Sequence, residues 1–317
     1  MVQEATLTHA AIDKAIYQDQ GRTYRGFLKQ HIMDVDDAYD DHIRDRFRSH
    51  MGVSTSGREC AREIWYGWRW AMVDKVSGRM LRLFNRGHLE EARFVAMLRT
   101  IGCQVWQTQG DGQQYRVSMF GGHYGSAIDG VVLGIPEMPN EPLLAEMKTH
   151  NEKSFRKLAG EQDREGNYLI QPKGVQEAKL EHYVQMQQYM KYFKLQFGLY
   201  CAVNKNTDEL WFEIVPYDAA CADHFIDRSQ RIIFTKEAPP RLSENENFWK
   251  CKYCNKRRVC HFGDAPDFNC RTCAAAQPQT DGTWYCSTHS SILDKERQLS
   301  GCPEWQAHPD LDSTRKK

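Results

Sequence analysis

The cysteines constrain this chain more than any other residue type, because they are spaced unevenly along it. Seven of the eleven lie after position 250, and most of these stand in short-spaced pairs. Such cysteines form disulfides in oxidising compartments and bind metals in reducing ones. Residues 1–15 are polar and lack the basic-then-apolar layout of a secretory signal. We therefore expect a cytoplasmic protein whose clustered cysteines hold metal.

The first cysteine set is Cys251, Cys254 and Cys260, with the spacing C-x2-C-x5-C. A four-coordinate site needs one more ligand. Two residues are candidates: Cys60, which is remote in the sequence, and His261, which directly follows the third cysteine. With His261 the site would suit zinc. With Cys60 it would offer four thiolates, the usual ligand set of a four-iron, four-sulfur cluster.

The second cysteine set follows a zinc-binding pattern, C-x2-C-x12-C-x2-H. Its members are Cys270, Cys273, Cys286 and His289. Each pair places two ligands on one side of a tetrahedron, as in structural Zn²⁺ sites. The spacer contains Asp281-Gly282, a favourable hairpin turn. These features predict a small zinc ribbon, in which Cys302 is an alternative to His289 as the fourth ligand.

The hydrophobic pattern of residues 56–236 changes from helical to strand-like and back. Helices are expected at residues 56–76, 79–100, 176–194 and 218–236. Strands are expected at residues 103–108, 115–119, 126–133, 142–148, 197–203 and 209–215, the last two as a hairpin. Residues 151–173 are polar and irregular and predict a loop. This order predicts an α/β (α+β) fold with a mixed sheet, rather than a repeating βαβ pattern.

Two of the predicted strands carry a group of charged residues. Asp129 stands among apolar neighbours, where a charge is costly unless it has a partner. On the next strand, Glu146 and Lys148 are two residues apart and therefore share a face. If the strands are adjacent, the two carboxylates converge and can hold one or two divalent cations. An ammonium beside them can orient or deprotonate a water, which suits metal-assisted hydrolysis of a phosphodiester.

These residues resemble the motifs of the PD-(D/E)XK nuclease superfamily, in particular its RecB-like and lambda-exonuclease-like branches. Residues 87–91, Gly-His-Leu-Glu-Glu, are similar to the Gly-x-x-x-Glu/His element that those branches carry on a helix before the sheet. Residues 185–189, Gln-Met-Gln-Gln-Tyr, are similar to their Gln-x-x-x-Tyr element on the helix after the catalytic strands. The proline of the family's name is Ile128 here, and RecB-like members often lack that proline.

The resemblance implies a restriction-endonuclease-like sheet flanked by helices, and a Mg²⁺- or Mn²⁺-dependent deoxyribonuclease. The implied metal ligands are Glu91, Asp129, Glu146 and the backbone carbonyl of Met147. Lys148 would activate the water, while Gln185 and Tyr189 would position Lys148 or the DNA. Two alternatives stay open. His88 is a rival to Glu91, because the two share a helix face, and residues 188–192 are a shifted second match to the Gln-x-x-x-Tyr element.

The first cysteine set, with one remote N-terminal cysteine, resembles the iron–sulfur staple of AddB-type and CRISPR-associated RecB-like nucleases. The resemblance implies a 4Fe-4S cluster held by Cys60, Cys251, Cys254 and Cys260. The expected organisation is a helical segment at 1–57, a nuclease core at 58–262 closed by the staple, and a zinc-binding appendage and tail at 263–317. The expected function is an exonuclease that processes DNA ends in recombination, repair or phage DNA metabolism in a bacterial cell.

The charge balance requires that any DNA be bound through a local basic patch. The chain has 42 basic and 42 acidic residues, so its net charge of zero gives no general attraction to phosphate. Basic residues follow the second catalytic strand, at 148–157, and surround the first cysteine set, at 250–258. Either group can neutralise phosphates. A helicase or another recombination protein is a further expected partner, and no apolar run is long enough to predict a membrane span.

Two other functions stay open from the residues alone. A catalytically inactive DNA-binding protein would keep the fold and the metals, but the intact set of Asp129, Glu146 and Lys148 argues against it. A zinc-bearing interaction protein would require the Glu-x-Lys triplet to be accidental. The aromatic run at 65–70 and the isolated cysteines are expected in the core. These isolated cysteines are Cys103, Cys201 and Cys221.

Overall fold

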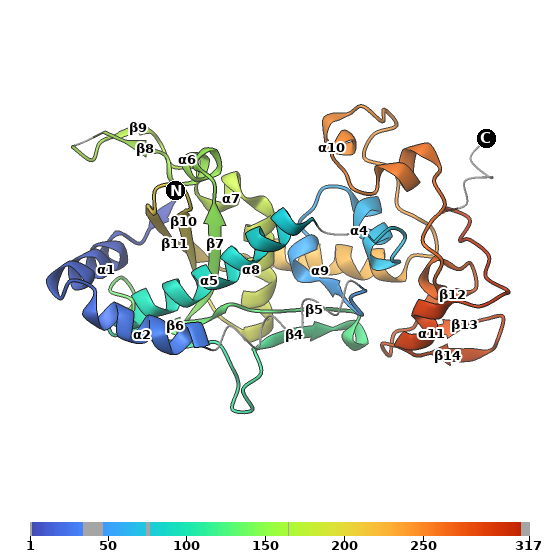
Figure 1. Cartoon of the computed structure of the whole chain (residues 1–317), viewed down its shortest axis with the longest axis horizontal. Coiled ribbons are helices and arrows are strands. Elements are labelled where there is room, and N and C mark those ends of the chain that lie inside the picture. The colour runs from blue at the N-terminus through green and yellow to red at the C-terminus, as the bar shows by residue number, and fades with distance from the viewer. Residues whose placement is uncertain (1, 34–46, 74–76, 164, 312–317) are drawn as a thin grey trace. The chain divides into compact units, whose positions relative to one another are not determined.

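The computed structural model of the chain describes residues 2–33, 47–73, 77–163 and 165–311 (Figure 1). The chain forms two compact units that interleave in sequence. The first unit comprises residues 1–44, 76–117 and 127–223, and the second comprises residues 45–75, 118–126 and 224–317. None of the described helices is long and apolar enough to cross a membrane.

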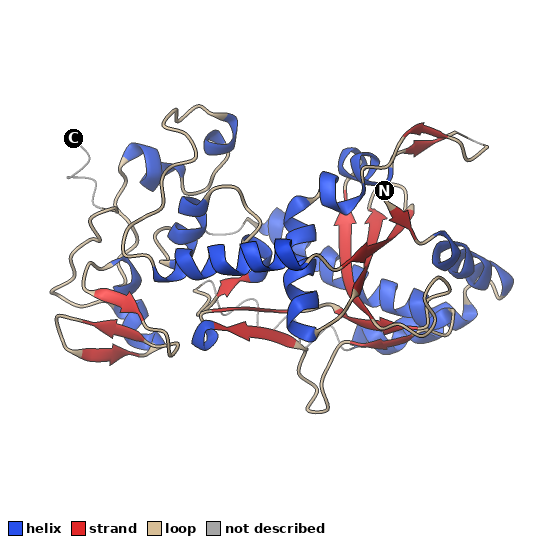
Figure 2. Cartoon of the chain, turned by 180° about the vertical axis from the view of Figure 1, so that it is seen from behind, coloured by secondary structure: helices blue, strands red, loops and turns tan. Residues whose placement is uncertain are grey.

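The first unit is built around a six-stranded mixed sheet (Figure 2). The strands, in spatial order, are β1 (Gln3–Glu4), β11 (Leu210–Pro216), β10 (Phe197–Asn204), β7 (Leu143–His150), β6 (Gly130–Leu133) and β3 (Gln104–Trp106). β7 and β10 pair in parallel, and the other neighbours pair antiparallel. The parallel pair lies at the centre, where both faces can be covered.

Helices cover both faces of this sheet. α1 (Thr6–Gln18), α2 (Arg22–Met33) and α5 (Gly78–Thr100) belong to one side, where Phe94 and Leu98 of α5 share a buried core with Met147 and Leu199. α6 (Glu152–Ala159), α7 (Gly174–Ala178) and α8 (Leu180–Phe193) belong to the other side, where Gly198 of β10 faces a methionine of α8. The predicted α/β fold, with a mixed central sheet flanked by helices, is confirmed.

Four predicted elements differ from the structure, and one of them, the helix expected at 176–194, is broken into α7 and α8 at Lys179. Residues 151–173 do not form an irregular loop, because they contain α6 and the hairpin of β8 (Glu161–Gln162) and β9 (Tyr168–Ile170). The side chain of Asn151 caps α6 by accepting a hydrogen bond from the Ser154 amide at 2.9 Å. Only two residues of α6, Phe155 and Leu158, are buried. That stripe is too narrow to stand out among the polar residues around it.

The other two differences concern element ends. The helix expected at 56–76 is the shorter α4 (Ala61–Trp68), and it ends where Trp70 adopts a left-handed φ of 51°. The strand expected at 126–133 is two strands, β5 (Tyr124–Ala127) and β6, with Asp129 in the bend between them. The bend takes Asp129 out of the strand ladder and leaves its carboxylate free to make local contacts.

The second unit holds both cysteine sets and is made of short elements. They include β2 (Met51–Gly52), α4, α10 (Trp249–Lys252), a π-helical turn (Arg258–Phe262), β12 (Ala276–Pro278), β13 (Trp284–Cys286), β14 (Ser291–Leu293) and α11 (Lys295–Ser300). β4 (Arg116–Met119), β5 and α9 (Ala219–Phe234) run from one unit into the other. β12, β13 and β14 form an antiparallel sheet whose first hairpin turns at Asp281-Gly282, as its sequence predicts.

Arginine and tryptophan side chains form the centre of the second unit. Arg271 is only 2% exposed, and its guanidinium lies 4.5 Å from the ring centroid of Trp68, 3.8 Å from that of Trp70 and 4.8 Å from that of Trp284. A buried guanidinium is tolerated because aromatic faces attract it and carbonyl oxygens accept its hydrogen bonds. The aromatic run at 65–70 is therefore core, and it does not present a surface on which bases could stack.

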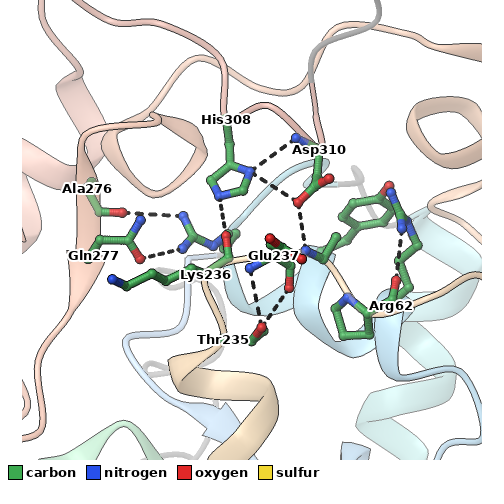
Figure 3. Close-up of polar contacts among 12 residues, drawn as sticks. Arg62, Thr235, Lys236, Glu237, Ala276, Gln277, His308 and Asp310 are labelled. Carbon is green, nitrogen blue, oxygen red and sulfur yellow. Dashed lines mark hydrogen bonds and ion pairs between the residues drawn. The ribbon is translucent and has the colours of Figure 1, made fainter. Parts of the chain in front are cut away.

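The end of the described chain is fastened to the segment that follows α9 (Figure 3). The Nε2 atom of His308 lies 3.0 Å from the Lys236 carbonyl oxygen, and the Ala238 amide donates to Asp310 at 2.8 Å. Arg62 of α4 donates to the Pro239 carbonyl oxygen at 2.9 Å. These contacts fix the residues on the C-terminal side of Cys302 within the second unit.

Candidate active site and cysteine clusters

The pairing of β6 with β7 brings the predicted carboxylates and lysine together. Gly130 pairs with Ala145, so Asp129 lies opposite the start of the Glu-x-Lys triplet. The Asp129 carboxylate accepts a hydrogen bond from the Met147 amide at 2.7 Å. The Lys148 ammonium lies 3.6 Å from Asp129 Oδ2 and forms an ion pair with Glu146 Oε1. Both strand acids and the amine therefore share one small volume.

The Glu146 carboxylate is completely buried. Lys148 contacts its Oε1 atom, while Oε2 has no hydrogen-bond partner among the described residues. Burial raises the pKa of Glu146 to about 8, and the negative charge of Asp129 adds to this effect, although Lys148 opposes it. A buried acceptor without a donor is costly. A cation bound beside Glu146 would remove that cost, so the residues present fit a divalent metal.

The same environment favours the charged form of Lys148. Burial alone would lower its pKa, but the attraction of Asp129 and Glu146 outweighs burial, and the pKa lies well above its ordinary value. The amine is therefore a protonated hydrogen-bond donor in this state. Besides these two ion pairs, its Nζ atom donates a hydrogen bond to the Met147 carbonyl oxygen at 3.3 Å, which keeps it over the same strand.

The helix acid of the predicted site also lies near these groups. Burial raises the pKa of Glu91, and the charge of Asp129 raises it further, while His88 and Lys148 lower it. The Nδ1 atom of His88 is 3.6 Å from Glu91 Oε1, and this contact raises the pKa of His88. The two rival helix ligands thus form one pair at the site. Glu90 instead pairs with Arg93 at 2.9 Å.

The Gln-x-x-x-Tyr residues of α8 reach the same end of the sheet. Gln185 donates to the Tyr189 hydroxyl at 3.0 Å, and that hydroxyl donates to the Ala127 carbonyl oxygen at 3.1 Å, two residues before Asp129. Gln185 and Tyr189 are buried, whereas Tyr192 of the shifted match is 41% exposed. Their hydrogen bonds fasten α8 to the bend that carries Asp129.

A group of polar residues that the sequence reasoning missed adjoins this site. Tyr200 of β10 lies opposite Glu146 in the parallel pairing. Its hydroxyl lies 2.9 Å from Nε2 of His150 and 2.7 Å from Nδ1 of His182. Two spacings carried the signal. His150 follows Lys148 by two residues on the strand, and His182 precedes Gln185 by three on the helix.

The four residues of the predicted iron–sulfur site lie in the second unit and act on one another electrostatically. Burial raises the pKa of the Cys254 thiol to about 11, and charges on Cys60 and Cys260 contribute. Burial also raises the pKa of Cys251, again with contributions from Cys60 and Cys260. Cys60 occupies the N-cap of α4, where its sulfur accepts a hydrogen bond from the Glu63 amide at 3.4 Å. The charge of the remote Cys60 therefore acts on both Cys251 and Cys254.

The second cysteine set gathers around Cys270. Burial raises the pKa of this thiol to about 11, and charges on Cys273, Cys302 and Cys286 raise it further, in that order. His289 is exposed and lies 3.6 Å from Glu304. The ligand atoms of His289, Cys302 and Glu304 all lie within 4.8 Å of one another. Cys302 therefore acts on Cys270 and also lies beside His289 and Glu304. His289 is exposed.

The basic groups proposed for phosphate binding are partly neutralised. Arg156, Lys250 and Arg258 each form an ion pair with a neighbouring carboxylate. Lys153 and Lys157 are exposed beside the catalytic strand. Exposed ion pairs are weak, so these arginines and lysines stay available to a polyanion that competes for them.

The buried carboxyl of Glu146 predicts an unusual dependence of stability on pH in metal-free protein. In the folded state the pKa of Glu146 is about 8, whereas the ordinary pKa of a glutamate side chain is 4.5. The stabilisation by the bound proton is complete below about pH 4.5 and is lost as the pH rises towards 8, with a slope of at most about 1.4 kcal/mol per pH unit. In a chelator, the melting temperature of the wild type should fall over this range more steeply than that of Glu146→Gln.

The matched control for that measurement is Glu165→Gln, which changes an exposed carboxylate of the same unit. Its melting curve should follow the wild type at every pH. Parallel slopes for the wild type and Glu146→Gln would show that the Glu146 pKa is not raised.

No protein-family model matches this chain, and no curated protein matches it in sequence. Among solved structures, the chain is similar to the crystal structure of SSO0001, with 16% identity over 76% of this chain and 96% of that chain and a TM-score of 0.36. It is also similar to the crystal structure of LHK-Exo in complex with dAMP, with 13% identity over 58% of this chain and 86% of that chain and a TM-score of 0.37. These likenesses are weak, so a function has to be argued from the geometry of the site.

Proposed function

We propose that this chain is a Mg²⁺- or Mn²⁺-dependent deoxyribonuclease of the PD-(D/E)XK type that hydrolyses phosphodiester bonds. One observation supports it above all others: Asp129, Glu146 and Lys148 meet, and an oxygen of the buried Glu146 has no hydrogen-bond partner among the described residues. A salt bridge with a purely structural role would not need a carboxylate oxygen without a hydrogen-bond partner. A cation site with an amine beside it does need one, because the cation binds that oxygen.

In this proposal Glu91, Asp129 and Glu146 hold the metal. When bound, Mg²⁺ or Mn²⁺ supplies Lewis-acid activation of the phosphate and of the attacking water. The Met147 amide donates a 2.7 Å hydrogen bond to Oδ2 of Asp129 and so orients this carboxylate. Lys148 is protonated, so its ammonium donates a hydrogen bond that orients the water or stabilises charge on the phosphate. Gln185 and Tyr189 set the distance between α8 and the strand that precedes Asp129.

We propose an exonuclease acting on DNA ends in recombination, repair or phage DNA metabolism, in the cytoplasm of a bacterial cell, alongside a helicase or another recombination protein. The site chemistry supports hydrolysis of DNA in general. The exonuclease mode comes from the resemblance of the motifs, and resolving product lengths on end-labelled single- and double-stranded DNA tests it.

Replacing Lys148 tests the enzymatic function. We expect Lys148→Ala to lower the rate of Mg²⁺- or Mn²⁺-dependent DNA hydrolysis by about 10²-fold or more, which is the usual effect of removing one donor to a developing charge. The rate is measured from end-labelled DNA with each metal. Lys14→Ala, an exposed lysine of α1 outside both basic groups, should keep the wild-type rate.

Asp129→Asn provides a second inactive variant in case loss of Lys148 unfolds the protein by leaving Glu146 unpaired. Circular dichroism spectra of both variants check the fold. If the wild type degrades no DNA form with either metal, or if folded Lys148→Ala degrades it at the wild-type rate, the nuclease proposal fails.

We further propose that Cys60, Cys251, Cys254 and Cys260 hold a 4Fe-4S cluster. The charges of Cys60 and Cys260 both raise the pKa values of Cys251 and Cys254, which supports a shared site, and four thiolates are the usual ligand set of such a cluster. The cluster would be structural, because its ligands and the acids of the nuclease site lie in different units.

Anaerobically purified protein should be brown and contain about four irons and four sulfides per chain. Cys60→Ser should lose the visible absorbance and most of the iron. Cys221→Ser, a half-buried cysteine outside both sets, should keep both. Colourless protein that contains zinc at this site, with iron absent from the anaerobic preparation, would favour the set with His261 instead.

For the second set we propose a structural zinc ion held by Cys270, Cys273 and Cys286 with Cys302 as the fourth ligand. The charge of Cys302 acts on the Cys270 thiol more strongly than that of Cys286, and this supports Cys302 over the exposed His289. Four thiolates are a common structural zinc set.

Zinc analysis of two single variants decides between these ligands. Cys302→Ser should lower the zinc content of the purified protein and its resistance to a chelator, because a three-thiolate site binds zinc more weakly. His289→Ala should retain one zinc per chain. The reverse result would restore His289 as the ligand.

A further inference from the structure

The polar residues of the active site continue in two rows that face each other. The strand row is Glu146, Lys148 and His150, alternate residues on one face of β7. The helix row is His182, Gln185 and Tyr189, which are spaced three and four residues apart on α8 and so share its face. At one end Tyr189 is fastened beside Asp129, and at the other end His182 meets Tyr200. The helix row therefore extends the site by about one turn beyond the Gln-x-x-x-Tyr element.

A continuous chain of hydrogen bonds crosses between the rows at that far end. Ser154 Oγ lies 2.9 Å from Nδ1 of His150, and Nε2 of His150 lies 2.9 Å from the Tyr200 hydroxyl. The same hydroxyl lies 2.7 Å from Nδ1 of His182. A phenol has a single proton, so it donates to one imidazole and accepts from the other. When both rings are neutral, the tautomer of one ring thereby sets the tautomer of the other.

The environment keeps both rings neutral. Burial lowers the pKa of His182, and the positive charges of Lys148 and Lys179 lower it further. Burial and the same two lysines also lower the pKa of His150. In one of the two possible arrangements of these hydrogen bonds, His150 donates to Tyr200 and Tyr200 donates to His182. The Nε2 atom of His182 then carries a proton and is a donor.

That Nε2 atom has no hydrogen-bond partner in the part of the chain that the structure describes, and the ring is partly exposed. The charged groups acting on it most strongly are cations, which disfavour a cationic ligand and favour an anionic one. An anionic acceptor would also select the arrangement in which Nε2 holds the proton. In a nucleic acid, the anionic acceptors beside a scissile bond are the oxygens of the neighbouring backbone phosphates.

We propose that His182 donates a hydrogen bond from Nε2 to a DNA backbone phosphate adjoining the scissile one. Tyr200 and His150 are positioning residues that fix its ring and tautomer. This inference rests on the proposed nuclease function, and it names a contact that makes the site bind a nucleotide chain in one register.

The test compares three substitutions of His182. Asparagine places an amide near the Nδ1 position and keeps the contact with Tyr200, whereas glutamine places a donor near the Nε2 position. His182→Ala and His182→Asn should raise KM for a single-stranded oligonucleotide about tenfold or more, the loss typical of one hydrogen bond to a charged group. Their kcat should stay close to that of the wild type. His182→Gln should keep a KM close to the wild-type value.

Equilibrium binding separates this inference from the nuclease proposal. The Kd of a fluorescent oligonucleotide, measured by anisotropy with Ca²⁺ in place of Mg²⁺, should rise in the same order among the variants, whether or not the wild type cleaves DNA. Wild type that binds but does not cleave would end the nuclease proposal alone. Equal Kd and KM values for the asparagine and glutamine variants, or a loss confined to kcat, would overturn the contact, as would wild type that binds no DNA.

The phosphate itself can be located with neutral methylphosphonates placed one at a time around the cleavage position. At the contacted phosphate, the substitution should weaken binding to the wild type about tenfold and change binding to His182→Ala much less. Melting temperatures of the three variants within a few degrees of the wild type show that the fold is kept. A methylphosphonate effect that is the same in the wild type and His182→Ala at every position would exclude the hydrogen bond.

Discussion

The burial of the Glu146 carboxylate in the centre of the sheet is the constraint on which the candidate active site depends. A charge in that position is stable only if an opposite charge compensates it, and the structure places the Lys148 ammonium against it, while the negative charge of Asp129 adds to the cost. The compensation is incomplete, because the Lys148 ammonium contacts one oxygen of Glu146 and the other oxygen has no hydrogen-bond donor among the described residues. That oxygen is the observation on which the proposed cation site rests.

The buried Glu146 carboxylate also explains how the residues around it are arranged. Asp129 lies in a bend rather than in a strand, so its carboxylate can accept the Met147 amide and still approach Lys148. Tyr189 fastens α8 to the residue before that bend. Glu91 comes from the helix on the other face of the sheet, and its raised pKa reflects burial close to Asp129. These neighbouring residues restrict the positions of the Asp129 and Glu146 carboxylates.

Sequence reasoning could foresee the parts of this arrangement that depend on short spacings. The strand period of two placed Glu146 and Lys148 on one face, and the hairpin-compatible distance paired their strand with that of Asp129. It could not foresee α6, whose buried stripe is only two residues wide. It also missed the contact between Tyr200 and the two histidines: the spacings of His150 and His182 pointed to the site, but Tyr200 joins it only through parallel pairing across some fifty residues. The position of Cys302 depends in the same way on a tail that folds back onto the second unit.

The interleaving of the two units in sequence has a consequence for biosynthesis. Trp65, Trp68 and Trp70 leave the ribosome early, but their partners Arg271 and Trp284 lie some two hundred residues later. At usual rates of translation, that separation corresponds to about 10–40 s. During this time a strongly aromatic helix has no core to enter, while most of the first unit is already synthesised. Assembly of the second unit is therefore a late event that coincides with the arrival of its last cysteines.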